Sequence, residues 1–332
     1  MIGYVELQCA SYFSFLRGCS APDELFVRAK ELGMEALAIT DQNSLAGVVR
    51  AHVAAEATGV RLIIGCRLVL SDATEILVYP TDRAAYGRLS RMLSVGKSRG
   101  GKGKCKLDWQ DVEDFNEGLI GILVPDVADD ACAAILRRVK RIFTDRAYMS
   151  LALRRRQDDH LRLHDLSNLA TQLRVPTVVT NDVLYHVHTK DRLHDVVTCI
   201  RNRCTIDTMG DLRHKYADRY LKTPEEMRRL FADYTDALNR TLRIADQCRF
   251  SLSELEYQYP EEKQVPGKTA IETLKHLTWA GAKWRYPEGV PEKVINLLKH
   301  ELQLIEKLGY EPYFLTVNAI VQYARSRDIL CQ

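Results

Sequence analysis

Paired cysteines and long apolar runs are both missing from this sequence. Its nine cysteines are an odd number and no CxxC spacing occurs, so neither a disulfide framework nor a zinc knuckle is indicated. Apolar runs such as ALAI at 36–39 are too short to cross a bilayer, and no secretory leader pattern precedes the first strand-like stretch. We therefore expect a cytoplasmic protein with no membrane partner.

Two common catalytic motifs are also absent. The sequence contains neither a GxxxxGK[ST] phosphate loop nor a GxSxG nucleophile elbow. The glycine-rich stretch SRGGKGK at 98–104 does not stand between a strand and a helix, as a phosphate loop would. Neither a P-loop enzyme nor an α/β-hydrolase is indicated.

Positive charge is concentrated although the net charge is only +3. Eight basic and no acidic residues lie between Arg83 and Lys106, and more basic residues follow at 137–141 and 154–156. One interpretation is a flexible solvated loop with polar helix faces. The other is contact with nucleic-acid phosphates. The candidates for that contact are Lys97, Arg99, Lys102 and Lys104.

Short β-branched segments alternate with helical patterns along the first part of the chain. Repeated β-α units predict a parallel sheet, and seven strands suit a closed barrel better than an open doubly wound sheet. Past Tyr220 the pattern is helical, interrupted by the irregular, proline-containing stretch 251–268. We expect a barrel over 1–250, a linker over 251–268 and a helical region over 269–332. The predicted strands are 5–8, 36–40, 60–65, 75–80, 118–124, 147–153 and 176–181.

The carboxyl ends of barrel strands are where functional residues gather. Here they carry Gln8, Asp41, Arg67 and Asp182, with no histidine among them. A metal-dependent hydrolase needs several converging histidines and carboxylates. The two aspartates are equally well explained as hydrogen-bond acceptors for backbone amides of their own turns.

One local cluster, LYHVHTKDRLHD, combines three histidines with an acidic residue. His186 and His188 would share a strand face, with Asp191 and His194 opening the next helix. A metal site and a set of surface histidines at a helix start are both compatible with this spacing.

Several longer stretches together resemble a known family. ELQCASYFSFLRG (6–18), LGMEALAITDQNSLAGVVRAH (32–52), RLIIGCRLVL (61–70) and VPTVVTNDVLYHVH (175–188) resemble the successive motifs of a PHP domain. This polymerase-and-histidinol-phosphatase module opens the bacterial C-family DNA polymerases. The stretch 300–332 resembles the segment leading into the polymerase palm. The resemblance implies an α/β fold, a PHP-type distorted (β/α)7 barrel followed by a mainly helical start of a palm domain.

The resemblance also implies that a metal site has been lost. Metal-binding PHP domains use histidines and carboxylates at positions that here hold arginines, glutamines and apolar residues. Arginines cannot lose their charge, so the two remaining acidic residues are expected to form ion pairs with them. The corresponding positions are Gln8, Ala10, Arg17, Gln42, Arg67, Glu75, Arg154, Asp182 and Leu184.

SYFSFLRG and DQNSLAGVVRAH resemble the error-prone, damage-induced branch of the family. The resemblance implies the N-terminal part of a DNA polymerase for translesion synthesis, with the barrel as a scaffold. DNA, deoxynucleoside triphosphates and Mg²⁺ would serve the full-length enzyme, with a sliding clamp and mutagenesis-complex proteins as partners. Its catalytic carboxylates are expected downstream, so this chain alone should hold no cofactor and no polymerase activity. The alternatives are a stand-alone PHP-type metal-dependent phosphoesterase and a non-catalytic DNA- or partner-binding module.

Overall fold

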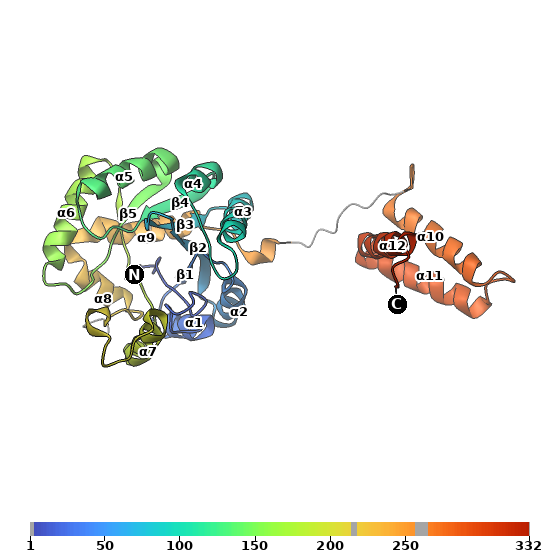
Figure 1. Ribbon diagram of the computed structural model, residues 1–332, viewed down its shortest axis with the longest axis horizontal. Coiled ribbons are helices and arrows are strands. Elements are labelled where there is room, and N and C mark those ends of the chain that lie inside the picture. The colour runs from blue at the N-terminus through green and yellow to red at the C-terminus, as the bar shows by residue number, and fades with distance from the viewer. Residues whose placement is uncertain (1–2, 214–217, 256–264, 332) are drawn as a thin grey trace. The chain divides into compact units, whose positions relative to one another are not determined.

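The computed structural model describes residues 3–213, 218–255 and 265–331, and the chain divides into two compact units, Met1–Leu255 and Glu256–Gln332. The first unit contains the β-sheet, whereas the described part of the second consists of helices and loops (Figure 1). No helix in the described ranges is long and apolar enough to span a membrane.

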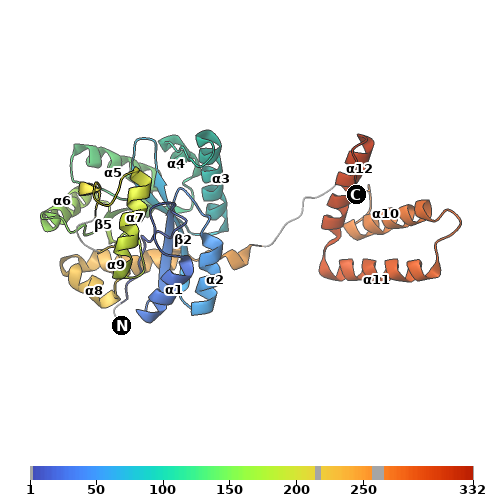
Figure 2. The same cartoon turned by 60° about the horizontal axis from the view of Figure 1, so that its bottom comes forward.

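The first unit is built on a curled six-stranded sheet whose strands follow one another in chain order. Its helices lie on the outside of the sheet, as Figures 1 and 2 show. The strands are apolar and mostly buried, which is the pattern of a sheet covered on both faces. They are β1 (Ala36–Gln42), β2 (Arg61–Val69), β3 (Glu75–Pro80), β4 (Leu119–Leu123), β5 (Ala147–Leu151) and β6 (Thr177–Val179).

The sheet is mixed, so the prediction of a purely parallel sheet is wrong. Strand β3 runs antiparallel to both β2 and β4, and the other neighbours pair in parallel. The connection between β2 and β3 is only residues 70–74. Because a parallel crossover needs about a dozen residues or more, β3 has to turn back along β2.

The stretch near the N-terminus forms isolated bridges, so the described sheet has six strands rather than the seven predicted. Glu6 bridges to Leu37 of β1, and Cys9 bridges to Val183, just beyond β6. The Ala38 N–H donates to the Glu6 carbonyl oxygen at 2.9 Å, which supports the first bridge. The segment therefore links the two edges of the curled sheet and closes the barrel.

Alternate side chains of the strands face the inside of the barrel and form a core of their own. Helix α9 (Thr235–Gln247) closes the end where the parallel strands begin, and Arg61 at the start of β2 donates to the Ala245 carbonyl oxygen at 2.9 Å. We call the opposite end, where the parallel strands finish, the barrel mouth. The inner core includes Ala38, Ile63, Leu77, Ile122, Tyr148, Val178 and Ile244.

A second, larger core lies between the sheet and the outer helices. The outer helices bury one face each and leave the other to solvent, as expected of helices that cover a barrel. These helices are α1 (Pro22–Glu31), α2 (Val48–Thr58), α3 (Arg83–Gly100), α4 (Trp109–Phe115), α5 (Asp130–Phe143), α6 (Asp159–Gln172), α7 (Asp191–Asn202) and α8 (Pro224–Leu230).

The second unit has a small core. Leu274, Leu302 and Leu315, one from each of its helices, form the buried centre. Thr269 caps the first helix by accepting a hydrogen bond from the Glu272 N–H. The helices are α10 (Ala270–Arg285), α11 (Glu292–Leu308) and α12 (Glu311–Ser326).

Candidate functional site at the barrel mouth

Continuing the inward alternation of β2 and β3 to the barrel mouth leads to Arg67 and Glu75. The guanidinium of Arg67 binds two carboxylates: Nη2 lies 2.5 Å from Oε2 of Glu75, and Nη1 lies 2.9 Å from Oδ1 of Asp182. Burial alone would lower the pKa of Arg67, but Asp182 and Glu75 outweigh it and raise the pKa. Arg67 thus ties β2, β3 and the segment after β6 together, as the arginine pattern predicted.

Arg219 is a second cation on Asp182, and no sequence pattern indicates it. Its Nη2 forms an ion pair with Oδ2 of Asp182, and its Nε donates to the Asp182 carbonyl oxygen. Burial would raise the pKa of the Asp182 carboxyl, but the charges of Arg219 and Arg67 hold it well below its ordinary range. Arg219 lies in a loop without strand or helix periodicity, so no pattern marked it. We call Arg67, Glu75, Asp182 and Arg219 the mouth cluster.

Neutral side chains occupy the other positions of the first and last motifs. Gln8 is buried, and its Oε1 accepts a hydrogen bond from the Thr180 hydroxyl at 2.7 Å. Ala10 and Leu184 belong to one small apolar cluster. Where the family resemblance places two histidines, this chain therefore has an apolar contact.

The end of β1 fastens the loop that precedes α1. Asp41 is buried and accepts hydrogen bonds from the Ser11 N–H and hydroxyl, both at 2.8 Å, and from the Ser14 hydroxyl at 2.7 Å. The Gln42 N–H donates to the same Ser14 hydroxyl at 3.0 Å. Burial raises the pKa of Asp41 to about 6. The interpretation that Asp41 bonds only its own turn is wrong, because its partners lie in a different loop.

Arg17 and Arg154 lie near the mouth cluster but form no ion pair with its carboxylates in the described ranges. The Nη1 of Arg154 binds Oδ1 of Asp126 at 2.9 Å. Burial and the charges of Arg201 and Arg67 lower the pKa of Arg17. The surroundings of Arg17 therefore already carry positive charge, which disfavours a metal cation.

Glu6 is a further buried carboxylate of the barrel interior. It accepts hydrogen bonds from the Tyr4 hydroxyl and the Gln8 N–H, both at 2.8 Å, and from the Asn181 N–H at 3.2 Å. Burial raises its pKa to about 7, although these hydrogen bonds oppose the shift. Glu6 is therefore a structural acceptor that joins the N-terminal segment to the end of β6.

These residues do not fit the metal ions that a PHP domain would bind. The guanidinium groups of Arg67 and Arg219 already occupy Oε2 of Glu75 and both carboxylate oxygens of Asp182, and they would repel a cation. Within the described ranges, no three or more His, Cys, Asp or Glu side chains are arranged to hold a metal ion. The mouth can stabilise the fold electrostatically, but it offers no free set of ligands.

The histidine cluster does not converge either. Nδ1 of His186 lies 2.8 Å from the Ser20 hydroxyl, the ring of His188 meets the edge of Tyr220, and His194 is buried in α7. Each imidazole has a different neighbour, so the metal interpretation of this segment finds no support here.

The basic stretch proves to be largely helical. Lys97 and Arg99 lie in the last turn of α3, and Lys102 and Lys104 follow in an exposed turn. The first pair therefore lies on a polar helix face rather than in a loop. Arg99 forms an ion pair with the buried Asp111 at 2.7 Å. No ion-pair partner is found for the three lysines in the part of the chain that the structure describes.

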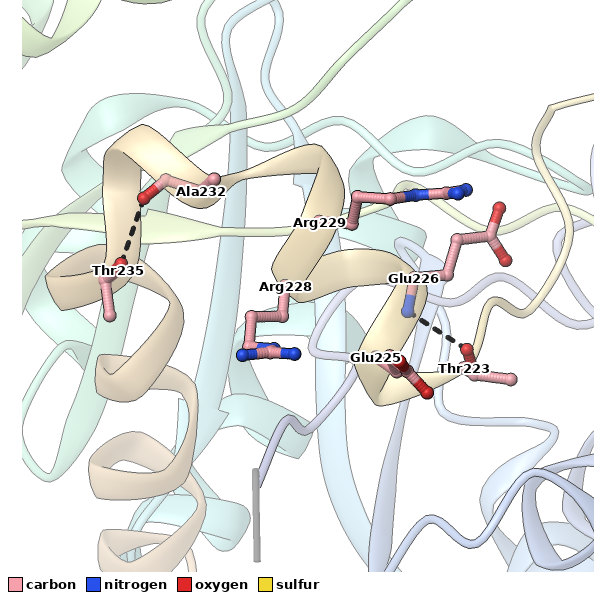
Figure 3. A pocket seen from close by; sticks show the side chains of 7 residues that line it. All are labelled: Thr223, Glu225, Glu226, Arg228, Arg229, Ala232 and Thr235. Atoms are coloured by element: carbon pink, nitrogen blue, oxygen red, sulfur yellow. Dashed lines mark hydrogen bonds between the residues drawn. The ribbon is translucent and has the colours of Figure 1, made fainter.

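A surface hollow over α8 and the start of α9 lacks the groups of a catalytic site (Figure 3). The hydroxyl of Thr223 accepts the Glu226 N–H at 3.0 Å, and that of Thr235 donates to the Ala232 carbonyl oxygen at 3.0 Å. Both hydroxyls are therefore engaged in holding helix ends. Among its charged groups, Glu225, Arg228 and Arg229 are exposed, and Glu226 is half-buried.

Comparison with protein families now places this barrel. Residues 6–157 match the family model "PHP domain", and residues 272–332 match "Bacterial DNA polymerase III alpha NTPase domain". The chain carries a PHP domain. The matched stretch includes Arg67 and Glu75 of the mouth cluster, whereas Asp182 and Arg219 lie beyond it.

Curated relatives align with this chain from the barrel through the helical region. The chain is 60% identical, over 99% of its length, to "Error-prone DNA polymerase 1" of Agrobacterium fabrum. It is 58% identical to "Error-prone DNA polymerase 2" of Rhizobium meliloti and 45% identical to "Error-prone DNA polymerase" of Caulobacter vibrioides, each over 99% of its length. It spans 30–31% of the length of these three relatives.

Proposed function

We propose that this chain is the N-terminal part of an error-prone DNA-directed DNA polymerase that acts in damage-induced mutagenesis and translesion synthesis. The observation that carries the proposal is the 60% identity over 99% of the chain to a protein of that name. The complete protein would extend a DNA primer with deoxynucleoside triphosphates across lesions. Mg²⁺, held by carboxylates outside this chain, would stabilise the attacking and leaving oxygens. It would work in the cytoplasm, with a sliding clamp and mutagenesis-complex proteins as partners.

Within that polymerase the PHP domain would serve as a structural scaffold. The mouth cluster supports this role, because Arg67 and Arg219 occupy the two carboxylates that a metal-dependent phosphoesterase would need. A scaffold requires only that the strands be held together, which buried ion pairs achieve.

Primer extension by the full-length gene product tests the polymerase proposal. We expect Mg²⁺-dependent extension on an undamaged template and past an abasic site, and no extension by residues 1–332 alone. Adding the sliding clamp should lengthen the products. Failure of the full-length protein to extend any primer, with a control polymerase active in the same buffer, would overturn the proposal.

Metal content separates the scaffold from the phosphoesterase. We expect elemental analysis of protein purified without chelator to find no stoichiometric zinc, manganese or iron in the PHP domain. Phosphoester hydrolysis should stay at background when these metals are added. Stoichiometric metal that disappears in Asp182→Asn would favour the phosphoesterase instead.

A further inference from the structure

Helix α3 presents a solvent face that carries only positive charge. Its buried residues, Ala85, Leu89, Met92, Leu93 and Gly96, follow helical spacing and face the sheet. The opposite face carries the exposed residues Arg83, Arg91, Ser94, Lys97 and Ser98. No acidic residue occurs between 83 and 106, so nothing on this stretch neutralises the face locally.

Most basic residues of α3 and the following turn have no ion-pair partner among the described residues. Arg88 and Arg99 form ion pairs with Glu117 and Asp111, at 3.6 Å and 2.7 Å. In the described parts of the chain, no ion-pair partner is found for the other six basic residues, which are all exposed. They are Arg83, Arg91, Lys97, Lys102, Lys104 and Lys106.

The turn after α3 is packed against the helix and continues its charged surface. The Lys106 N–H donates to the Gly96 carbonyl oxygen at 2.8 Å. A Cβ at Gly96 would lie 2.6 Å from Leu107 Cδ2, and one at Gly100 would lie 2.9 Å from the Cys105 nitrogen, so this close packing requires glycine at both positions. The lysines of the turn are therefore held beside the last turn of α3.

The spacing of the charges suits a nucleic-acid backbone. Arg83 and Lys97 are separated by about 21 Å along the helix axis, at a rise of about 1.5 Å per residue. One strand of duplex DNA presents about six phosphates over that length, at about 3.4 Å per phosphate. Ser94 and Ser98 lie between the cations, and their small hydroxyl side chains allow close approach to phosphate oxygens.

An acidic protein is a poorer match for this face. Protein interfaces usually rely on buried aromatic or large apolar anchors. Among the described residues, no large apolar side chain between Val53 and Val127 is strongly exposed. A positively charged surface without apolar anchors is typical of proteins that contact phosphates. Such contacts do not depend on the base sequence of the nucleic acid.

On the basis of the DNA polymerase function proposed above, we propose that the exposed face of α3 and the following turn form a DNA-contact surface on the PHP domain. This surface binds the phosphate backbone of duplex DNA without sequence preference. Its contribution is to hold the template-primer close to the protein.

Two charge-matched variants of this chain test the proposal. Arg91→Gln with Lys97→Gln removes two cations from the surface, and Arg228→Gln with Arg229→Gln removes two exposed cations from α8. Binding of a fluorescent 30-base-pair duplex is measured by anisotropy over a salt series. We expect the α3 variant to bind roughly tenfold or more weakly at about 0.1 M salt, with the slope of log K against log salt reduced by about two. The α8 variant should bind like the unmodified chain, and thermal unfolding should show both variants folded.

Equal effects of the two variants, or no effect of either, would overturn the proposal. Binding of polyglutamate without binding of duplex would assign the surface to an acidic protein instead. The polymerase proposal is judged separately, by primer extension with the full-length protein. If the full-length protein fails to extend primers and still loses duplex binding in its α3 variant, that result would support the DNA-contact surface and refute the polymerase proposal.

Discussion

The PHP barrel and the helical unit differ in how completely they bury their own apolar side chains. The barrel has two extended cores, one inside the curled sheet and one beneath the outer helices. The helical unit buries one leucine from each helix, while Trp284 is 76% exposed and Ile320 and Tyr323 are each 62% exposed. Exposed apolar surface of this kind marks a region that requires a further partner.

The difference indicates that the barrel can fold by itself, whereas the helical unit depends on other protein surface. Strand pairing, ion pairs and α9 all close the barrel within one unit. The chain spans only 30% of a relative such as "Error-prone DNA polymerase 1". Four predictions test this comparison, from the largest expected effect to the smallest.

The largest expected difference is in local stability. Amides of α11 and α12 should exchange with solvent at least about a hundredfold faster than those of β2 and β4, because few buried contacts hold the helices in place. Hydrogen exchange read by mass spectrometry measures this. Limited proteolysis should cut first between residues 255 and 268 and leave an intact barrel. Equal protection of both units would contradict the comparison.

The second prediction concerns the mouth cluster. Arg67→Ala should lower the free energy of unfolding of the barrel by about 3 kcal/mol, because it takes the only mouth-cluster cation from the half-buried Glu75 and one of two cations from the buried Asp182. Arg154→Ala removes an arginine from a more exposed pair with Asp126 and should cost at most about 1 kcal/mol. Urea unfolding of both variants provides the comparison. An equal, small loss for both would mean that the mouth cluster does not hold the barrel together.

A third prediction introduces a histidine at a position where the family resemblance places a metal ligand. Leu184→His places an imidazole in the apolar cluster around Ala10. It should destabilise the barrel by roughly 1–3 kcal/mol, because the apolar side chains of this cluster offer the ring nitrogens no hydrogen-bond partner. Leu184→Met is the matched control and should cost less than about 1.5 kcal/mol. Added zinc should not restore the melting temperature of the histidine variant. Full rescue by zinc would show that the mouth still binds metal.

The smallest effect is a pH dependence of opposite sign for two carboxylates. Burial raises the pKa of Glu6 from 4.5 to about 7, so its contribution is fully present below pH 4.5 and is lost as the pH rises to about 7. The pKa of Asp182 is lowered from 3.8, so its contribution is present above pH 3.8 and is lost in stronger acid. Glu6→Gln should therefore flatten the stability profile between pH 4.5 and 7 and leave the acid limb unchanged. A profile that Glu6→Gln leaves unaltered would contradict the assignment.

The sequence was most informative where side-chain alternation and strand ends coincide. Arg67, Glu75 and Asp182 were expected to pair, and they do, because each lies at or just beyond the end of a buried strand. Arg219 was missed because it lies in an irregular loop 37 residues from its partner, where no period applies. The direction of β3 was predicted wrongly because its apolar pattern is the same in either orientation, and only the length of the preceding turn distinguishes them.

Arg67 also changes what the stability of the barrel depends on. A bound metal stabilises a fold by mass action, so its effect rises and falls with the concentration of the free ion. The guanidinium of Arg67 is covalently part of the chain, so every molecule contains one. It cannot be removed by a chelator or replaced by a competing ion. The melting temperature of the PHP domain of this chain should therefore not depend on whether the cells that contain it are depleted of metal or supplied with it.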